Sequence, residues 1–170
     1  MDETTPDEQS LAEYLNEIGA TSDVVQQGLR YYLAERSGDL PPTHMEERLV
    51  SAAEDARAVE EQLQTLQASS SQLEELSLLY LSYAWDNPAE RSAIRRALQG
   101  ANLQLPVVES AVVAIVVMYG MYLIATRGRS GVRETTRRDA DGSFRTVKET
   151  TYASPAGWIS GIINLFTPSP

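Results

Sequence analysis

The chain has 170 residues, with 24 acidic and 14 basic side chains, a formal net charge of -10 and 42% hydrophobic residues. This apolar fraction is sufficient for a folded core, and the length fits one domain with an appendage. The sequence contains no cysteine and a single histidine, His44. That composition excludes disulfides, thiolate metal sites and a cysteine nucleophile.

Charge is divided unevenly along the chain. Residues 1–105 carry 19 acidic and 7 basic side chains, whereas residues 106–170 carry 5 acidic and 7 basic ones. Binding to phosphate backbones requires clustered Lys and Arg, so we expect no nucleic-acid partner for the acidic N-terminal part. The first ten residues are acidic and polar, unlike the basic and apolar start of a secretory signal.

Residues 1–105 are predicted to form an acidic bundle of about five helices, because apolar residues recur there at helical spacing between Gly and Pro breaks. The most regular pattern is a heptad seam, which predicts a helix of the coiled-coil type. Its apolar residues are Met45, Leu49, Ala52, Ala56, Val59, Leu63 and Leu66. Three of these, Val59, Leu63 and Leu66, are candidate interaction residues.

Residues 106–126 are predicted to form a long apolar helix that is a candidate transmembrane segment. Ser110 to Thr126 is uncharged and has no polar face, and 20 helical residues span about 30 Å, the thickness of a bilayer's hydrocarbon core. A core helix of a bundle, or a buried strand in the first part, is the alternative. The membrane orientation stays open, because the flanking arginines and the cost of translocating residues 1–105 favour opposite directions.

Residues 127–153 are predicted to form a basic β-hairpin. Two runs rich in Thr, Val and aromatic residues flank Asp139-Ala140-Asp141-Gly142, and Gly142 suits the positive φ of a tight turn. A two-stranded ribbon is marginal by itself, so it rests on the helices, pairs with another copy or lies along a charged surface. The candidate interaction residues here are Arg133, Arg137 and Arg138.

Residues 154–170 are predicted to form a short apolar helix and a tail. About 12 helical residues are too few to cross a bilayer, so this helix either lies in a membrane interface or docks onto the bundle. Trp158 is its candidate interaction residue, because an indole ring suits the headgroup region.

No pattern in the sequence indicates catalysis. There is no phosphate-binding loop, His44 has only sequence-adjacent acids beside it, and the acidic pairs lie on solvated helix faces. We therefore expect no enzyme, no cofactor, no metal site and no small-molecule substrate.

Three functional hypotheses remain. The first is a non-enzymatic, membrane-anchored adaptor that binds a protein partner and the lipid bilayer. The second is a self-assembling structural subunit, such as part of a cytoplasmic filament or shell, with its apolar helices buried between copies. The third is a membrane-disrupting effector or its regulator.

Overall fold

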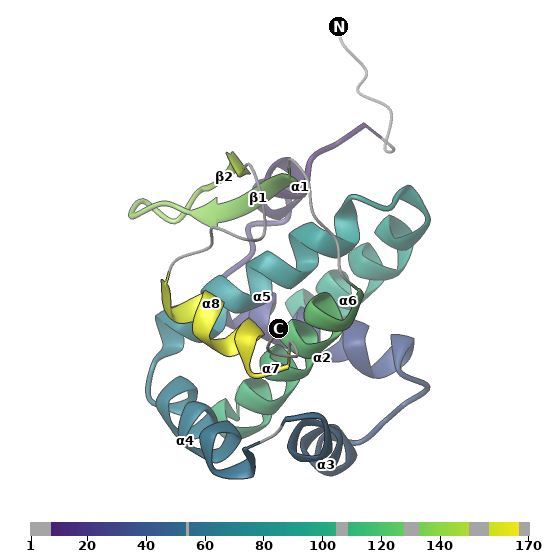
Figure 1. The fold of residues 1–170 in the computed structure, drawn as a ribbon. Helices are drawn as coiled ribbons and strands as arrows, with labels where there is room; N and C mark the ends of the chain where they lie inside the picture. Colours follow the sequence, from purple (N-terminus) through teal and green to yellow (C-terminus); the bar gives the residue numbers. More distant parts are fainter. Residues whose placement is uncertain (1–7, 54, 105–108, 128–132, 150–156, 167–170) are drawn as a thin grey trace, which may run out of the picture.

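The computed structural model describes residues 8–53, 55–104, 109–127, 133–149 and 157–166. It is mainly helical with a two-stranded antiparallel hairpin (Figure 1), which confirms the predicted fold at this level. The helices are α1 (Leu11–Glu17), α2 (Ser22–Arg36), α3 (Pro42–Ala52), α4 (Ala56–Gln67), α5 (Ser70–Trp85), the 3-10 helix η1 (Pro88–Glu90), α6 (Arg91–Leu103), α7 (Ser110–Arg127) and α8 (Gly157–Asn164). The strands are β1 (Arg133–Arg138) and β2 (Phe144–Glu149).

Side-chain caps begin several of these helices. Ser10 and Glu13 form a capping box at α1, in which the Ser10 hydroxyl accepts from the Glu13 N–H and the Glu13 carboxylate accepts from the Ser10 N–H. Thr21 caps α2 and Ser69 caps α5 in the same way, each accepting a hydrogen bond from a first-turn N–H. Asn87 caps η1, as its position before Pro88 predicts.

The heptad seam is divided between two helices. The chain leaves α3 at Ala53, which is extended, and Asp55 begins α4 by accepting hydrogen bonds from the N–H groups of Arg57 and Ala58. The heptad repeat alone predicts one continuous helix, but the Asp55 N-cap starts a second helix at this point. Both helices pack against α7 and bury the seam residues Met45, Leu49, Val59, Leu63 and Leu66, whereas Ala52 and Ala56 beside the break are exposed.

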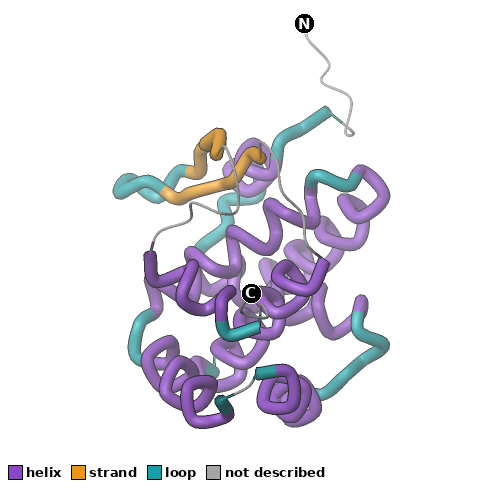
Figure 2. The backbone as a smooth tube through the Cα atoms, in the orientation of Figure 1, coloured by secondary structure: helices purple, strands orange, loops and turns teal. Residues whose placement is uncertain are grey.

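Helix α7 lies at the centre of the helical part. It contacts α2, α3, α4, α5 and α8, and Figure 2 shows helices around it on several sides. Its residues Val113, Ala114, Val117, Met118 and Met121 are fully buried. Burial on this scale supplies a large part of the folding free energy, at about 25 cal/mol per Å² of apolar surface.

The expectation that residues 106–126 cross a membrane was wrong. Within the part of the chain that the structure describes, no helix is both long enough and apolar enough to span a bilayer. A helix without a polar face requires apolar surroundings on every side, and neighbouring helices meet that requirement as well as lipid does. In this structure the neighbouring helices surround α7. The first residues of the predicted segment, up to 108, lie outside the described residues.

Helix α8 docks onto α7. Ile159, Ile162 and Phe166 are buried, and the Phe166 ring meets the ring of Tyr122 edge-on with centroids 5.4 Å apart. Trp158 belongs to this helix, but its side chain lies outside the described residues.

The hairpin rests on helices, with β1 against α5 and β2 against α1. The Asp139 N–H donates to the Ser143 carbonyl oxygen, so these two residues are a hydrogen-bonded pair. Hydrogen-bonded and non-hydrogen-bonded pairs alternate along antiparallel strands, so the backbone N–H and C=O groups of Thr136 and Phe144 point away from the partner strand. Thr136 N–H donates to Ser82 Oγ at 2.9 Å. Phe144 N–H donates to Asn16 Oδ1 at 2.7 Å, and Asn16 Nδ2 donates to Phe144 O at 2.9 Å. Side chains of α5 and α1 thus bond both outer edges of the hairpin.

We expect Leu63→Asp to destabilise the fold by more than about 3 kcal/mol, because it places an unpaired carboxylate in the core. Leu63 is 5% exposed and lies on the face of α4 that packs inward. Gln64→Asp on the exposed side of the same helix is the matched control. Urea unfolding of both variants measures the difference, and similar midpoints would contradict the buried position of Leu63.

Two glycines provide a second test of packing. A Cβ at Gly28 would lie 2.5 Å from Leu98 Cδ2, and Leu98 is fully buried between α2 and α6, so Gly28→Ala should cost about 1 to 3 kcal/mol. A Cβ at Gly100 meets no atom within 4 Å, so Gly100→Ala should stabilise α6 by up to about 1 kcal/mol. Thermal unfolding checks both signs, and an unchanged or raised melting temperature for Gly28→Ala would contradict the close approach of α2 and α6.

Candidate functional site

The candidate residues of the heptad seam lie in the core. Val59 and Leu66 are fully buried and Leu63 is nearly so. They pack within this chain, on the inner face of α4.

The candidate arginines of the hairpin lie on β1. Arg138 Nε lies 2.8 Å from Glu74 Oε1, so this arginine forms an ion pair with a mostly buried carboxylate of α5. Arg137 is exposed beside it, and the Arg133 side chain lies outside the described residues. The structure brings Arg137 and Arg138 to the rim of a cavity of about 380 Å³ between β1 and the start of α5.

A larger cavity lies where α2, α3, α5, η1 and α7 converge. Its volume is about 600 Å³, within the range of about 300 to 1,000 Å³ that is typical of ligand sites. Four of its lining residues are tyrosines, and its charged groups are two guanidiniums and one carboxylate. We call it the tyrosine–arginine cavity, and its principal lining residues are Tyr32, Arg36, Arg48, Tyr80, Tyr83, Asn87, Glu90 and Tyr119.

Helical spacing directs these side chains to one place. Tyr32 and Arg36 are four residues apart on α2, and Tyr80 and Tyr83 are three apart on α5, so each pair shares a helix face. The rings of Tyr32 and Tyr80 lie 6.4 Å apart across the two helices. Gly120 of α7 lets the Tyr80 ring approach, because a Cβ there would lie only 3.0 Å from Tyr80 Cδ2.

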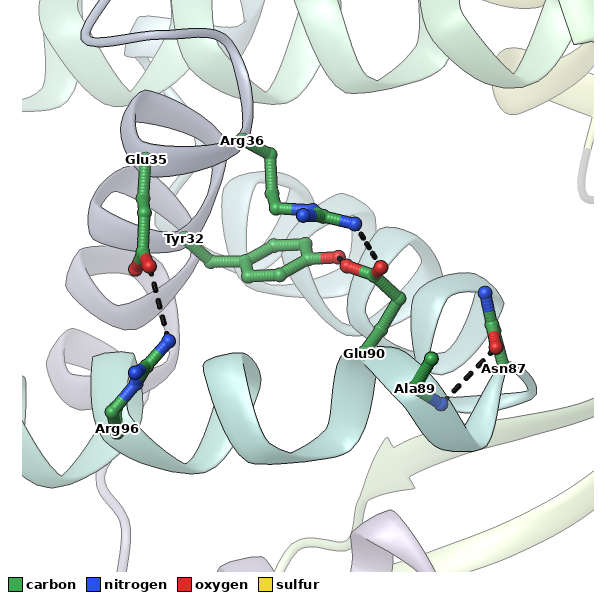
Figure 3. A network of polar contacts seen from close by, with 7 residues as sticks. All are labelled: Tyr32, Glu35, Arg36, Asn87, Ala89, Glu90 and Arg96. Carbon is green, nitrogen blue, oxygen red and sulfur yellow. Dashed lines mark hydrogen bonds and ion pairs between the residues drawn. The ribbon is translucent and has the colours of Figure 1, made fainter.

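Glu90 is the centre of the polar network in this cavity (Figure 3). The Tyr32 hydroxyl donates to one carboxylate oxygen, and Arg36 forms an ion pair with the other. Both oxygens of Glu90 are therefore engaged, and its charge is balanced by Arg36. Figure 3 also shows the neighbouring pair Arg96 and Glu35, joined at 3.1 Å on the outer side of α2 and α6.

Burial raises the pKa of Tyr32 well above its ordinary value of 10.0, and the hydrogen bond to Glu90 raises this pKa further. Ionisation would place a second negative charge against the carboxylate. The hydroxyl consequently remains a hydrogen-bond donor at every physiological pH.

Arg48 is the second guanidinium of the cavity. It is exposed, and its Nη1 donates to the hydroxyl of the buried Tyr119 at 3.1 Å. Among the residues that the structure describes, no carboxylate forms an ion pair with Arg48. The charged groups that line the cavity thus carry one net positive charge, in a chain whose net charge is -10.

Sequence reasoning did not find this cavity. Its residues come from five separate elements, and no local motif connects them. One signal was present in the composition: the chain has 8 tyrosines and 2 phenylalanines, although a purely apolar core needs no hydroxyl groups.

No protein-family model matches the chain, and comparisons with curated proteins and with solved structures give no match.

The ionisation of Tyr32 predicts a loss of stability at alkaline pH. The folded chain retains a proton that the unfolded chain releases, so this contribution is complete below about pH 10 and declines as the pH rises further. Between pH 9 and 11 the free energy of unfolding should fall less in Tyr32→Phe than in the wild type, by as much as about 1 kcal/mol. Urea titrations at both pH values measure this, and equal losses would contradict it.

The Arg138–Glu74 ion pair predicts a local effect on the hairpin. Arg138→Glu places two carboxylates together, so amide exchange at Thr136 should accelerate as its bond to Ser82 is lost. The charge swap Arg138→Glu with Glu74→Arg should restore part of the protection. The control is Arg57→Glu on the exposed face of α4. Equal exchange at Thr136 in all these variants would show that the pair does not hold the hairpin.

Proposed function

We propose that this chain is a non-enzymatic interaction protein that holds an anionic group of its binding partner in the tyrosine–arginine cavity. The observation that carries the proposal is the position of Arg48. Its guanidinium lies at a cavity wall, is held there by Tyr119 and forms no ion pair with a described carboxylate. An arginine held in this way has donors left for a ligand.

The chemistry of the lining supports an anionic ligand with a flat apolar part. Arginine guanidinium groups and tyrosine hydroxyl groups both donate charge-assisted hydrogen bonds to carboxylates. Tyrosine rings offer large apolar faces at a small entropic cost, since few side-chain torsions are frozen on binding. The tilted pair of Tyr80 and Tyr83, with ring centroids 5.7 Å apart, forms one such wall.

The same lining supports binding without turnover. Glu90 is hydrogen-bonded and ion-paired on both oxygens, which favours a structural role over that of a general base. The tyrosine next to it keeps its proton, because the pKa of Tyr32 is raised. Fixed donors and fixed charge pairs are the features of a preorganised recognition site.

Phenylacetate tests the proposal, since it combines one carboxylate with one aromatic ring. We expect it to shift the amide resonances of residues around Arg48 and Tyr119 in a nuclear magnetic resonance titration. Arg48→Gln should weaken binding by about tenfold or more, because a charge-assisted hydrogen bond is lost.

Two controls make the titration decisive. Arg57→Gln removes an exposed arginine on α4 that does not line the cavity, and should leave the affinity unchanged. Phenylacetamide has the same shape without the charge and should bind more weakly than phenylacetate. The proposal fails if phenylacetate gives no saturable shifts, or if Arg48→Gln binds it as well as the wild type does.

A further inference from the structure

A second cavity adjoins the tyrosine–arginine cavity. It has a volume of about 660 Å³ and is lined by Leu40, His44, Glu47, Arg48, Ser51, Ala52 and Tyr122. Arg48 lines both cavities. On α7, Tyr119 lines the first and Tyr122 the second, and their rings lie 5.8 Å apart. Arg48 is therefore a wall common to both cavities, and we call the two cavities together the groove.

Charge changes along this groove in a defined order. The first cavity contains Arg36, whose charge is balanced by Glu90. Arg48 lies at the junction, without an ion pair to a described carboxylate. Beyond it, the second cavity contains the exposed carboxylate of Glu47, which has no ion pair to a described cation. An aromatic wall, a positive charge and a negative charge thus follow one another.

We infer that the groove binds an extended segment of a partner protein, with an aromatic side chain in the first cavity, a carboxylate at Arg48 and a basic side chain at Glu47. This inference rests on the proposed function and names its ligand. An extended chain advances about 3.3 Å per residue and its side chains alternate between two faces, so alternate residues, about 7 Å apart, can reach successive parts of a groove. A small aromatic acid can use the first cavity and Arg48, but it cannot also reach Glu47.

The charge on Glu47 is what distinguishes a peptide from a small acid. A single exposed ion pair adds little affinity. When three side chains of one peptide bind to the same groove, their contributions to the binding free energy add, because the entropic cost of association is incurred only once. The exposed His44 and Ser51 on the same helix leave this end of the groove accessible to a partner.

Two blocked peptides of opposite order test the inference, because the groove can be entered in either direction. They are acetyl-Ser-Tyr-Ser-Glu-Ser-Lys-Ser-amide and acetyl-Ser-Lys-Ser-Glu-Ser-Tyr-Ser-amide, in which the aromatic, acidic and basic side chains share one face of the extended chain, and their affinities are measured by calorimetry at low salt. We expect one of them to bind at least about tenfold more tightly than phenylacetate. Raising the salt concentration should weaken this binding, since the paired charges are exposed.

Charge reversal at Glu47 tests whether the basic side chain of the peptide binds there. Glu47→Lys should remove most of the peptide's advantage and leave phenylacetate binding unchanged. A peptide with Glu in place of its Lys should recover affinity for this variant. Glu60→Lys, on the exposed face of α4, is the matched control and should change neither affinity.

Each outcome separates the inference from the proposed function. If phenylacetate binds and neither peptide binds more tightly, the ligand is a small acid and the inference is overturned while the proposed function stands. If a peptide binds tightly but Glu47→Lys leaves its affinity unchanged, the groove does not extend past Arg48 and the inference is again overturned. If phenylacetate does not bind, the proposed function itself is wrong, and the inference that rests on it is overturned as well.

Discussion

The burial of α7 is the constraint on which the rest of the structure depends. This helix has no polar face between Ser110 and Thr126, so any contact with water along it is unfavourable. Helices α2, α3, α4, α5 and α8 cover it, and each contributes an apolar stripe to the interface. The inward face of α4 and the docking of the C-terminal helix both follow from the need to enclose it.

The tyrosine–arginine cavity is a consequence of the same packing. The cavity lies near the last turns of α2 and α5, between helices that pack on α7, and tyrosines line it there. Their rings continue the apolar core, while their hydroxyls begin a polar surface. Tyr119 shows both properties, since its ring is buried and its hydroxyl accepts a hydrogen bond from Arg48. A recognition surface can therefore form without any loss of core packing.

The hairpin is joined to the bundle by polar contacts as well as by the buried Phe144 ring. Asn16 engages both backbone groups of Phe144, and Ser82 accepts the outward N–H of Thr136. A short ribbon with few apolar residues gains stability in this way, and its bonded edges are less accessible to strands of another copy. The sequence indicated the ribbon and its turn at Gly142, but not these helix partners, which are over fifty positions away along the chain.

Local signals in the sequence determined the helical class, the helix start at Asn87 and Pro88, and the hairpin turn, because caps, prolines and positive-φ glycines act within a few residues. They could not determine what surrounds residues 110–126, since a helix without a polar face fits lipid and protein equally well. Only the tertiary structure decided that, by placing other helices around α7. The candidate site has the same origin: Tyr32, Arg48, Glu90 and Tyr119 are distant in sequence and acquire a shared chemistry only where their helices meet.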